Sequence, residues 1–236
     1  NSRGADAQGS GGGRLAGVAR LCGTWREAHS LGATDGVIVG AEANADDVAR
    51  VARPRAALFI EGKLSRARAV AGLGEWTHPY HGPDNNPQST DTIARGPYLT
   101  RFLATPYYGP MPEVTVTAGG RIFKAFGHVS YKERAWPLLN KLICLNAFNG
   151  TLLWERKLTP GYLVHRNAMV ATEDALYLSD NDSCKVIDAA TGKVRDEIVI
   201  TPKQGGPAWK WMAQSDGVLY ALVGKKDPLD ETLKGT

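Results

Sequence analysis

An internal repeat limits the folds that this chain can adopt. Residues 145–151 (LNAFNGT) align with residues 187–193 (IDAATGK), and the two copies lie 42 residues apart. A second pair, residues 174–178 (DALYL) and 217–221 (GVLYA), repeats after 43 residues, and residues 120–124 (GRIFK) are an earlier copy of the same strand. A period of about 40–45 residues that holds several short strands is typical of one four-stranded blade of a β-propeller.

Alternating apolar residues and short turns divide the repeat region into five predicted β-hairpins. Their strands are 114–117 with 121–126, 141–145 with 152–157, 168–171 with 175–179, 184–187 with 194–200, and 209–214 with 218–223. No long helical pattern interrupts them. The sequence therefore predicts a mainly β protein, built as a partial β-propeller of four-stranded antiparallel blades.

The turns of the repeat have a physical cause. Gly150 and Gly192 can take a positive φ at no steric cost where the chain reverses between two twisted strands. The side chains of Asn146 and Asp188 can accept backbone N–H bonds across these loops. Trp154 follows Gly150 by four residues, on a strand where its indole can pack flat against the next blade. The predicted structural motif thus comprises Asn146, Gly150, Trp154, Asp188, Thr191 and Gly192.

The first 74 residues differ in composition, with one tryptophan and no tyrosine, while residues 75–236 hold the other five tryptophans and all eight tyrosines. We predict a flexible leader at 1–13, a small α/β, Rossmann-like domain at 14–74, blades at 75–224 and a tail at 225–236. The α/β domain would hold helices at 14–29 and 45–53 and buried strands at 36–40 and 56–60, which form one β-α-β unit.

That α/β segment resembles the later half of a class I S-adenosylmethionine-dependent methyltransferase. The resemblance rests on Asp35, the following strand, and the turn at residues 51–54 (VARP). Arg55 and Ala56 stand where the family usually has two glycines, and the family's Gly-rich loop after the first strand is absent. The resemblance implies a degenerate or truncated remnant of such a domain, and a generic α/β segment explains the pattern equally well.

The repeats resemble those of pyrroloquinoline-quinone (PQQ)-type propellers, the quinoprotein alcohol dehydrogenase-like superfamily, whose repeat reads roughly Ala-x-Asp-x-x-Thr-Gly-Lys-x-x-Trp. The first copy keeps Gly150 and Trp154, whereas the second has Asp196 where the tryptophan is expected. The second copy keeps Asp188, Thr191, Gly192 and Lys193. The segment before the first blade is also similar to the family's, with Trp76, Asp84, Asn86 and Ser89. The resemblance covers residues 75–224.

Candidate ligand-binding residues lie in the predicted loops and on one strand. Trp209 and Trp211, at positions i and i+2, would share one face of a strand and could stack on a flat quinone, although packing between blades also explains them. His165 and Arg166 lie near a strand end, where they could contact an anion or serve as surface residues. His78 and His81 could ligate a metal, but an ordered loop without metal is the favoured interpretation, and no metal site is predicted.

Composition and motifs exclude several function classes. The net charge is +4, which gives no basic patch for nucleic acid, and no apolar run reaches the ~20 residues of a membrane span. No signal-peptide pattern occurs in this sequence, so we expect either that it has been removed or that the true N-terminus lies elsewhere. No serine-hydrolase, zinc-protease or Walker motif occurs. Because a propeller closes with about 4–8 blades, we expect the chain to be a fragment whose partners are the remaining blades of a longer protein.

Three functional hypotheses remain. The leading one is a non-catalytic propeller segment that binds a small molecule or a protein. The second is part of a quinone-dependent dehydrogenase whose active-site blades lie outside this chain, for which the resemblance implies PQQ and calcium as cofactors. The third is a methyltransferase fused to a propeller. Whether the chain is an enzyme therefore stays open, and the resemblance implies a periplasmic or extracellular location.

Overall fold

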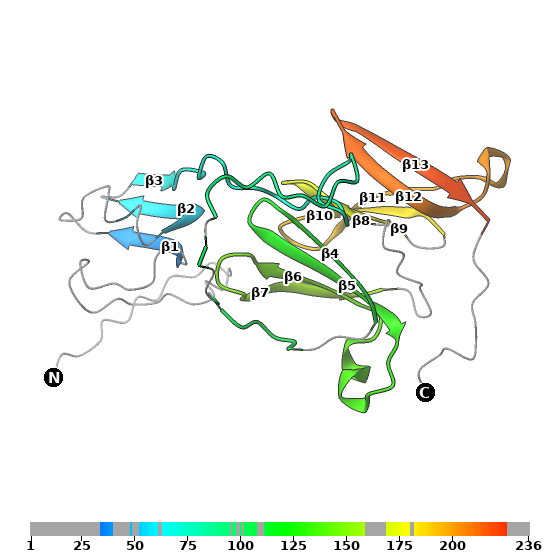
Figure 1. Ribbon diagram of the computed structural model, residues 1–236, viewed down its shortest axis with the longest axis horizontal. Coiled ribbons are helices and arrows are strands. Elements are labelled where there is room, and N and C mark those ends of the chain that lie inside the picture. Colours follow the sequence, from blue (N-terminus) through cyan, green and yellow to red (C-terminus); the bar gives the residue numbers. More distant parts are fainter. Residues whose placement is uncertain are drawn as a thin grey trace, which may run out of the picture. The chain divides into compact units, whose positions relative to one another are not determined.

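The computed structural model describes residues 34–39, 48, 52–60, 63–94, 96–97, 100, 102–107, 111–158, 169–179 and 182–225 of the 236-residue chain (Figure 1). The chain divides into two compact units, residues 1–69 and residues 70–236, close to the boundary predicted at residue 74. In the described part, regular structure consists mainly of strands, so the protein is mainly β. No helix among these residues is long and apolar enough to cross a bilayer.

The first unit contains a three-stranded mixed sheet. Strands β1 (Thr34–Val39) and β2 (Ala52–Ile60) pair in parallel, and β3 (Lys63–Arg66) pairs antiparallel with β2. A small cluster of Val48, Ala52, Ala56 and Leu58 forms its core. The predicted leader at 1–13 and helix at 14–29 lie outside the described residues. The Rossmann-like architecture of residues 14–74 stays a prediction.

The predicted helix at 45–53 is wrong at its C-terminal end. Val48 is helical, but Ala52 already lies in β2, four residues before the predicted strand. Pro54 favours an extended Arg53 before it, and it lies where the β1–β2 register jumps from Ala52 to Ala57. Proline is tolerated in a strand at such an irregularity because no ladder hydrogen bond is lost there.

The described residues of the second unit form three antiparallel sheets. The first is β4 (Met111–Ala118), β5 (Arg121–Val129), β6 (Lys141–Asn146) and β7 (Leu152–Lys157). The second is β8 (Met169–Ala171), β9 (Ala175–Ser179), β10 (Cys184–Asp188) and β11 (Val194–Ile198). The third is the pair β12 (Ala208–Ser215) and β13 (Val218–Gly224). The two complete sheets run in sequence order and resemble propeller blades, which confirms the predicted four-stranded antiparallel sheets.

Corresponding positions recur in all three sheets. A row of paired residues crosses the first sheet through Val116, Phe123, Cys144 and Trp154. The same row in the second sheet is Val170, Tyr177, Val186 and Asp196, and in the third it is Ala213 and Tyr220. The repeat in the sequence therefore corresponds to the same pairing of residues across the strands of each sheet.

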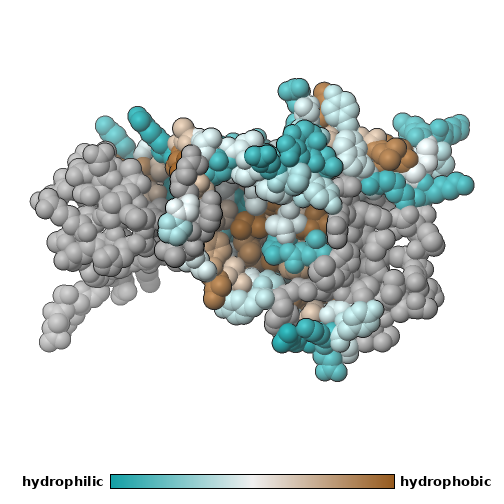
Figure 2. All heavy atoms as spheres, in the orientation of Figure 1, coloured by the Kyte–Doolittle hydropathy of each residue, from teal (hydrophilic) through white to brown (hydrophobic). Residues whose placement is uncertain are grey.

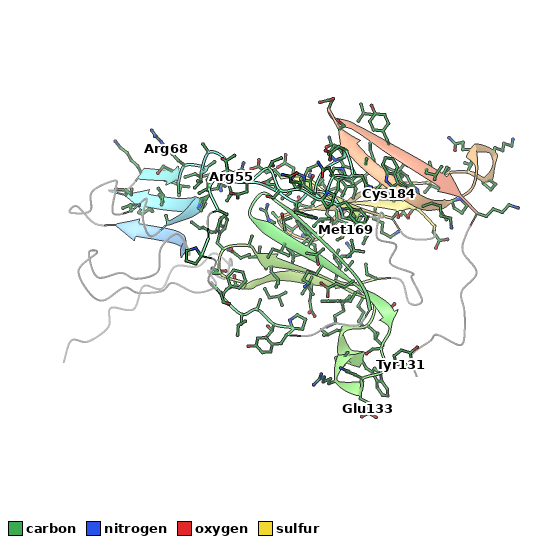
Figure 3. The ribbon with its side chains drawn as sticks, viewed as in Figure 1. Arg55, Arg68, Tyr131, Glu133, Met169 and Cys184 are labelled. Carbon is green, nitrogen blue, oxygen red and sulfur yellow. The ribbon has the colours of Figure 1, made fainter. Side chains whose placement is uncertain are left out.

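The connection between the second and third strands differs between the blades. Phe123 pairs with Cys144, 21 residues on, whereas Tyr177 pairs with Val186, nine residues on. The longer connection of the first blade contains the 3₁₀ helix η2 (Glu133–Leu138) and projects from the sheet, with Tyr131 and Glu133 on it (Figure 3). A shorter 3₁₀ helix, η3 (Pro202–Gln204), precedes β12.

Two apolar clusters join the sheets. Between the first and second sheets, Val116, Phe123 and Cys144 pack with Met169, Leu176 and Ile187, and all six are fully buried. Between the second and third sheets, Val170 and Cys184 pack with Trp209 and Met212; Met169 and Cys184 are labelled in Figure 3. The rows of the first and second sheets thus each face the next sheet along the chain, which is the packing that a propeller needs.

Candidate functional site

The edge of the first blade is joined to the second blade through Trp154. Its indole Nε1–H donates to the carbonyl of Ala189 at 3.1 Å, and its ring lies tilted against Phe123 at 5.9 Å between ring centroids. Arg156, two residues on, donates to the carbonyl of Gly192 at 2.9 Å. With the bond from the Arg121 guanidinium to the carbonyl of Glu173 at 3.3 Å, these polar contacts connect two blades whose buried interface is apolar.

The turn of the second repeat is organised by Asp188. Its carboxylate accepts hydrogen bonds from the amide of Ala190, from the amide and hydroxyl of Thr191, and from the guanidinium of Arg195. In the first repeat, the side chain of Asn146 accepts from the amide of Phe148 at 2.8 Å. An Asx-type loop therefore recurs with a charged residue in one copy and a neutral one in the other.

We expect Asp188 to titrate near pH 2 in the folded protein. The Arg195 guanidinium and then the Thr191 hydroxyl and amide hold the pKa of this carboxyl at about 2, below its usual 3.8. Because the folded pKa is lowered, the stabilisation is complete above pH 3.8 and is lost as the pH falls towards 2. Carbon-13 NMR of the aspartate carboxyls measures this titration. Arg195→Gln should return the pKa towards 3.8, and an unchanged pKa in that variant would contradict the assignment.

Each motif glycine lies beneath an aromatic ring. A Cβ at Gly192 would be 2.7 Å from the Trp154 ring, and a Cβ at Gly150 would be 2.5 Å from the ring of Phe102. Both glycines have a positive φ, 71° and 73°. Phe102 therefore covers the turn of the first blade as Trp154 covers the turn of the second, although no sequence pattern predicts this role for Phe102. Phe102 lies outside any strand and has no repeat signal, so only the fold identifies it.

The segment before the first blade, residues 76–81, is here named the strap, and it spans three sheets. The amide of Thr117 in β4 donates to the carbonyl of Trp76 at 2.6 Å, and the amide of Ala171 in β8 donates to the carbonyl of Thr77 at 2.9 Å. The amide of Gln214 in β12 donates to Nε2 of His78 at 3.0 Å. Three consecutive strap residues thus accept from the first strand of each successive sheet.

The donors of these three bonds occupy corresponding positions. Thr117, Ala171 and Gln214 each follow the first residue of their row, namely Val116, Val170 and Ala213. First-strand amides on the side away from the second strand have no partner within their own sheet. The strap therefore satisfies one such amide per sheet and ties the three first strands together.

The two strap histidines are hydrogen-bonded within the fold. His78 and His81 are 4% and 8% exposed and exchange backbone hydrogen bonds of 3.2 and 3.1 Å. Nε2 of His81 accepts from the amide of Thr90 at 3.3 Å, and its ring meets Trp76 edge-on at 5.3 Å between centroids. Since Nε2 of His78 accepts from Gln214, that lone pair is engaged. Within the described ranges, no group of three or more His, Cys, Asp or Glu is placed to hold a metal ion.

The prediction that Trp209 and Trp211 share a face is wrong. Trp209 pairs with Val223 and Trp211 pairs with Leu222, so a one-residue bulge at Lys210 separates the indoles. Such a bulge reverses the alternation of side chains. Trp209 is buried against the second sheet, whereas Trp211 lies on the opposite face. The other two predicted ligand residues, His165 and Arg166, lie outside the described residues.

Trp211 lines a small pocket with the strap. Besides Trp211 and Met212, the pocket is bounded by His78, Pro79, Pro83 and Asn85. A second pocket is lined by Pro79 and Tyr80 of the strap and by Glu113 of β4. These pockets, the strap and the edge of β12 are the candidate ligand site of the described chain. No described cysteine lines these pockets. Cys144 and Cys184 are buried in the blades, and burial raises the pKa of the Cys144 thiol to about 12.

We expect Trp154→Phe to destabilise the protein by about 1–2 kcal/mol more than Trp209→Phe. The first change removes a hydrogen bond and leaves the buried Ala189 carbonyl unpaired. Nε1 of Trp209 is buried without a hydrogen-bond partner, so its replacement removes an unsatisfied donor. Urea unfolding of both variants measures the difference. Equal losses would show that the Trp154–Ala189 bond contributes nothing between the blades.

In comparisons with known proteins, no protein-family description and no curated protein matches the sequence. Among solved structures, the crystal structure of BamB from Moraxella catarrhalis is similar to the chain, with 12% sequence identity and a TM-score of 0.33. The match covers 45% of this chain and 32% of the BamB chain, so the chain spans less than two thirds of that protein. The resemblance to propeller blades rests on the strand order and registers of the sheets rather than on this similarity.

Proposed function

We propose that this chain is a segment of a PQQ-like β-propeller that serves as a ligand- or protein-binding scaffold. The observation that carries the proposal is the recurring row: Phe123 faces the second sheet, and its counterpart Tyr177 faces the third. The finer, quinone-type assignment rests on the turn at residues 187–193, which has the family's Asp-x-x-Thr-Gly-Lys pattern. The turn itself is built by side-chain hydrogen bonds to Asp188.

The open face of the third sheet is the proposed docking surface. Val218, Tyr220 and Leu222 are 49%, 53% and 62% exposed, and Figure 2 shows apolar atoms at the surface over β13. Tyr220 corresponds in register to Phe123 and Tyr177, which both face a following sheet. The partner that fits this face is a further blade with a matching apolar row. The partners that we propose are accordingly the remaining blades of a longer protein.

The described residues do not fit PQQ and calcium. The quinone carries several carboxylates, and a pocket that holds it needs cationic side chains. Beside Trp211 the pocket offers an imidazole that accepts a hydrogen bond, two prolines and the amide of Asn85. Calcium needs six to eight oxygen ligands, many of them carboxylates, and no acidic residue lines this pocket. We therefore derive no redox step for this chain.

The scaffold proposal is tested by titration calorimetry of the chain with PQQ and Ca²⁺, together with a dye-linked assay of alcohol oxidation. We expect neither tight quinone binding nor turnover, because the pocket lacks cationic and acidic side chains. A control titration with the Trp211→Ala variant separates stacking on this indole from binding elsewhere. Tight binding that depends on Trp211 and supports oxidation would overturn the non-catalytic part and favour the dehydrogenase.

The dehydrogenase stays a second candidate because one indole, that of Trp211, lies beside a pocket on the strap. In that case the acidic and basic residues would come from blades outside this chain. A longer protein that oxidises alcohols, and loses this activity on Trp211→Ala, would support it. Retained activity in that variant would count against a role for this pocket.

The parallel pairing of β1 and β2 agrees with the methyltransferase hypothesis but does not favour it. A generic α/β segment has the same pairing, so residues 14–74 are proposed as a remnant without cofactor binding. Calorimetric titration with S-adenosylmethionine should give no binding heat, and saturable binding would reverse this proposal. A periplasmic or extracellular location is proposed from the repeat resemblance, and cell fractionation of the native protein would test it.

A further inference from the structure

The third of the three strap bonds differs chemically from the other two. Thr117 and Ala171 donate to backbone carbonyls, which do not titrate, whereas Gln214 donates to an imidazole nitrogen. Nε2 can accept this bond only while it carries no proton. We propose that His78 is an acid-sensitive latch, which holds the third sheet to the strap while its imidazole is neutral and releases that sheet on protonation.

The hydrogen bonds around His78 fix its neutral form. Because Nε2 accepts from Gln214, the proton of the neutral ring lies on Nδ1, 2.8 Å from the hydroxyl oxygen of Thr77. That hydroxyl can accept from Nδ1–H because it donates its own hydrogen to the carbonyl of His81 at 3.3 Å. A second proton on the ring would place an N–H against the N–H of Gln214, with both donors directed at each other.

The surroundings oppose protonation of the latched ring. Burial is the main cause that lowers the pKa of His78 below 6.5, and nearby His81 lowers it further, while Asp84 acts in the opposite direction. From β12, the residues beside the ring are Met212, Ala213 and Gln214, none of which titrates. From β8, the strap meets Ala171, which carries no charge. No described group next to the ring compensates for a buried imidazolium apart from Asp84.

The direction of the pH dependence follows from the difference in the pKa of His78 between the latched and the released states. Once released into water, His78 has an ordinary pKa of about 6.5, so protons bind the released state more strongly than the latched state. The latch is closed above that pH. Below about pH 6.5, the equilibrium constant for opening of the latch should increase by up to about tenfold per pH unit. This increase ends when the pH reaches the lowered pKa of the latched ring.

Release would act on a particular part of the molecule. Gln214 belongs to β12, which carries Trp209 and Met212 into the cluster behind the second sheet and Trp211 into the strap pocket. Loss of its bond releases the third sheet from the strap, while Trp76 and Thr77 keep the first two sheets tied. The apolar cluster with Trp209 and Met212 still joins the third sheet to the second. The proposed docking face on β13 and the Trp211 pocket would thus respond to acid together. The latch itself does not depend on which ligand the scaffold binds.

The test is amide hydrogen exchange of the intact chain by NMR, measured from pH 7.5 to 5 and corrected for the intrinsic rate. Ala171 is the internal control, because its amide occupies the corresponding position but donates to a carbonyl. We expect protection of Gln214 to fall by up to about tenfold per pH unit below about 6.5 while that of Ala171 holds. Equal pH dependence of the two amides, including joint loss through unfolding, would overturn the proposal.

A matched variant separates titration from packing. In His78→Gln, the side-chain amide oxygen can take the place of Nε2 and accept from Gln214, but it does not titrate. We expect the Gln214 amide of this variant to stay protected from exchange at pH 7.5. We also expect that it does not show the additional loss of protection in acid. If the additional loss persisted in His78→Gln, another group would be responsible and the latch would be disproved. The comparison of amides in the wild-type chain stands even if the variant fails to fold.

Discussion

Gly192→Ala is expected to destabilise the protein by about 3 kcal/mol. Two costs add: the positive φ of 71°, which is unfavourable by about 1–2 kcal/mol for a residue with a Cβ, and overlap with the Trp154 ring, 2.7 Å from the new Cβ. Overpacking of this kind costs about 1–3 kcal/mol when the neighbours must move. Urea unfolding followed by circular dichroism measures the change in the free energy of unfolding.

Gly217 provides the matched control for this prediction. It also has a positive φ, 79°, but a Cβ there would meet no atom within 4 Å. Gly217→Ala should therefore show the backbone cost alone, about 1–2 kcal/mol. If the two alanine variants lost the same stability, Trp154 would not lie on Gly192, and the contact between the first two blades would be wrong.

Phe123→Ala is expected to cost about 3–5 kcal/mol, the range for a large side chain removed from a well-packed core. Phe123 is fully buried between the first and second sheets and contacts Trp154. Its counterpart in the third sheet, Tyr220, is 53% exposed, so Tyr220→Ala should cost less than about 1 kcal/mol. Thermal and urea unfolding of both variants provide the comparison.

The same pair of variants tests the open face. Both residues occupy the same position in the repeat, so intrinsic strand propensity affects them alike. A large loss at Tyr220, equal to that at Phe123, would mean that the face of β13 is covered in solution. That result would contradict the proposal that this face is free to receive a further blade.

The sequence predicted the hairpins well because their signals are local. Alternation marks the strands, and the glycines at 150 and 192 mark turns that need a positive φ. The loop role expected for Asp188 depends only on residues within seven positions of it. The spacing of the repeats also carried a signal that was missed. Residues 122 and 176 occupy corresponding positions of the repeat but lie 54 residues apart, whereas the other copies repeat after 42 or 43 residues. This larger spacing indicates the longer connection in the first blade.

Other features depend on contacts that no local pattern reveals. The bulge at Lys210 inserts one residue into β12 without a glycine or proline to mark it, and this reverses the expected orientation of Trp211. The hydrogen bond between His78 and Gln214 joins residues 136 positions apart. Phe102 covers Gly150 from a segment outside the repeat. The bulge and the two long-range contacts depend on how the sheets pack against one another, and this packing exists only in the folded protein.

Successive sheets pack with the row of one sheet against the turn of the next, as blades do. Nuclear Overhauser contacts between the indole protons of Trp154 and the α-protons of Gly192, measured in the isotope-labelled chain, report on this packing. We predict strong contacts, because the ring lies where a Cβ of residue 192 would be. If the indole protons of Trp154 showed contacts only within β4 to β7, the sheets would not pack as successive blades, and the propeller architecture would be disproved.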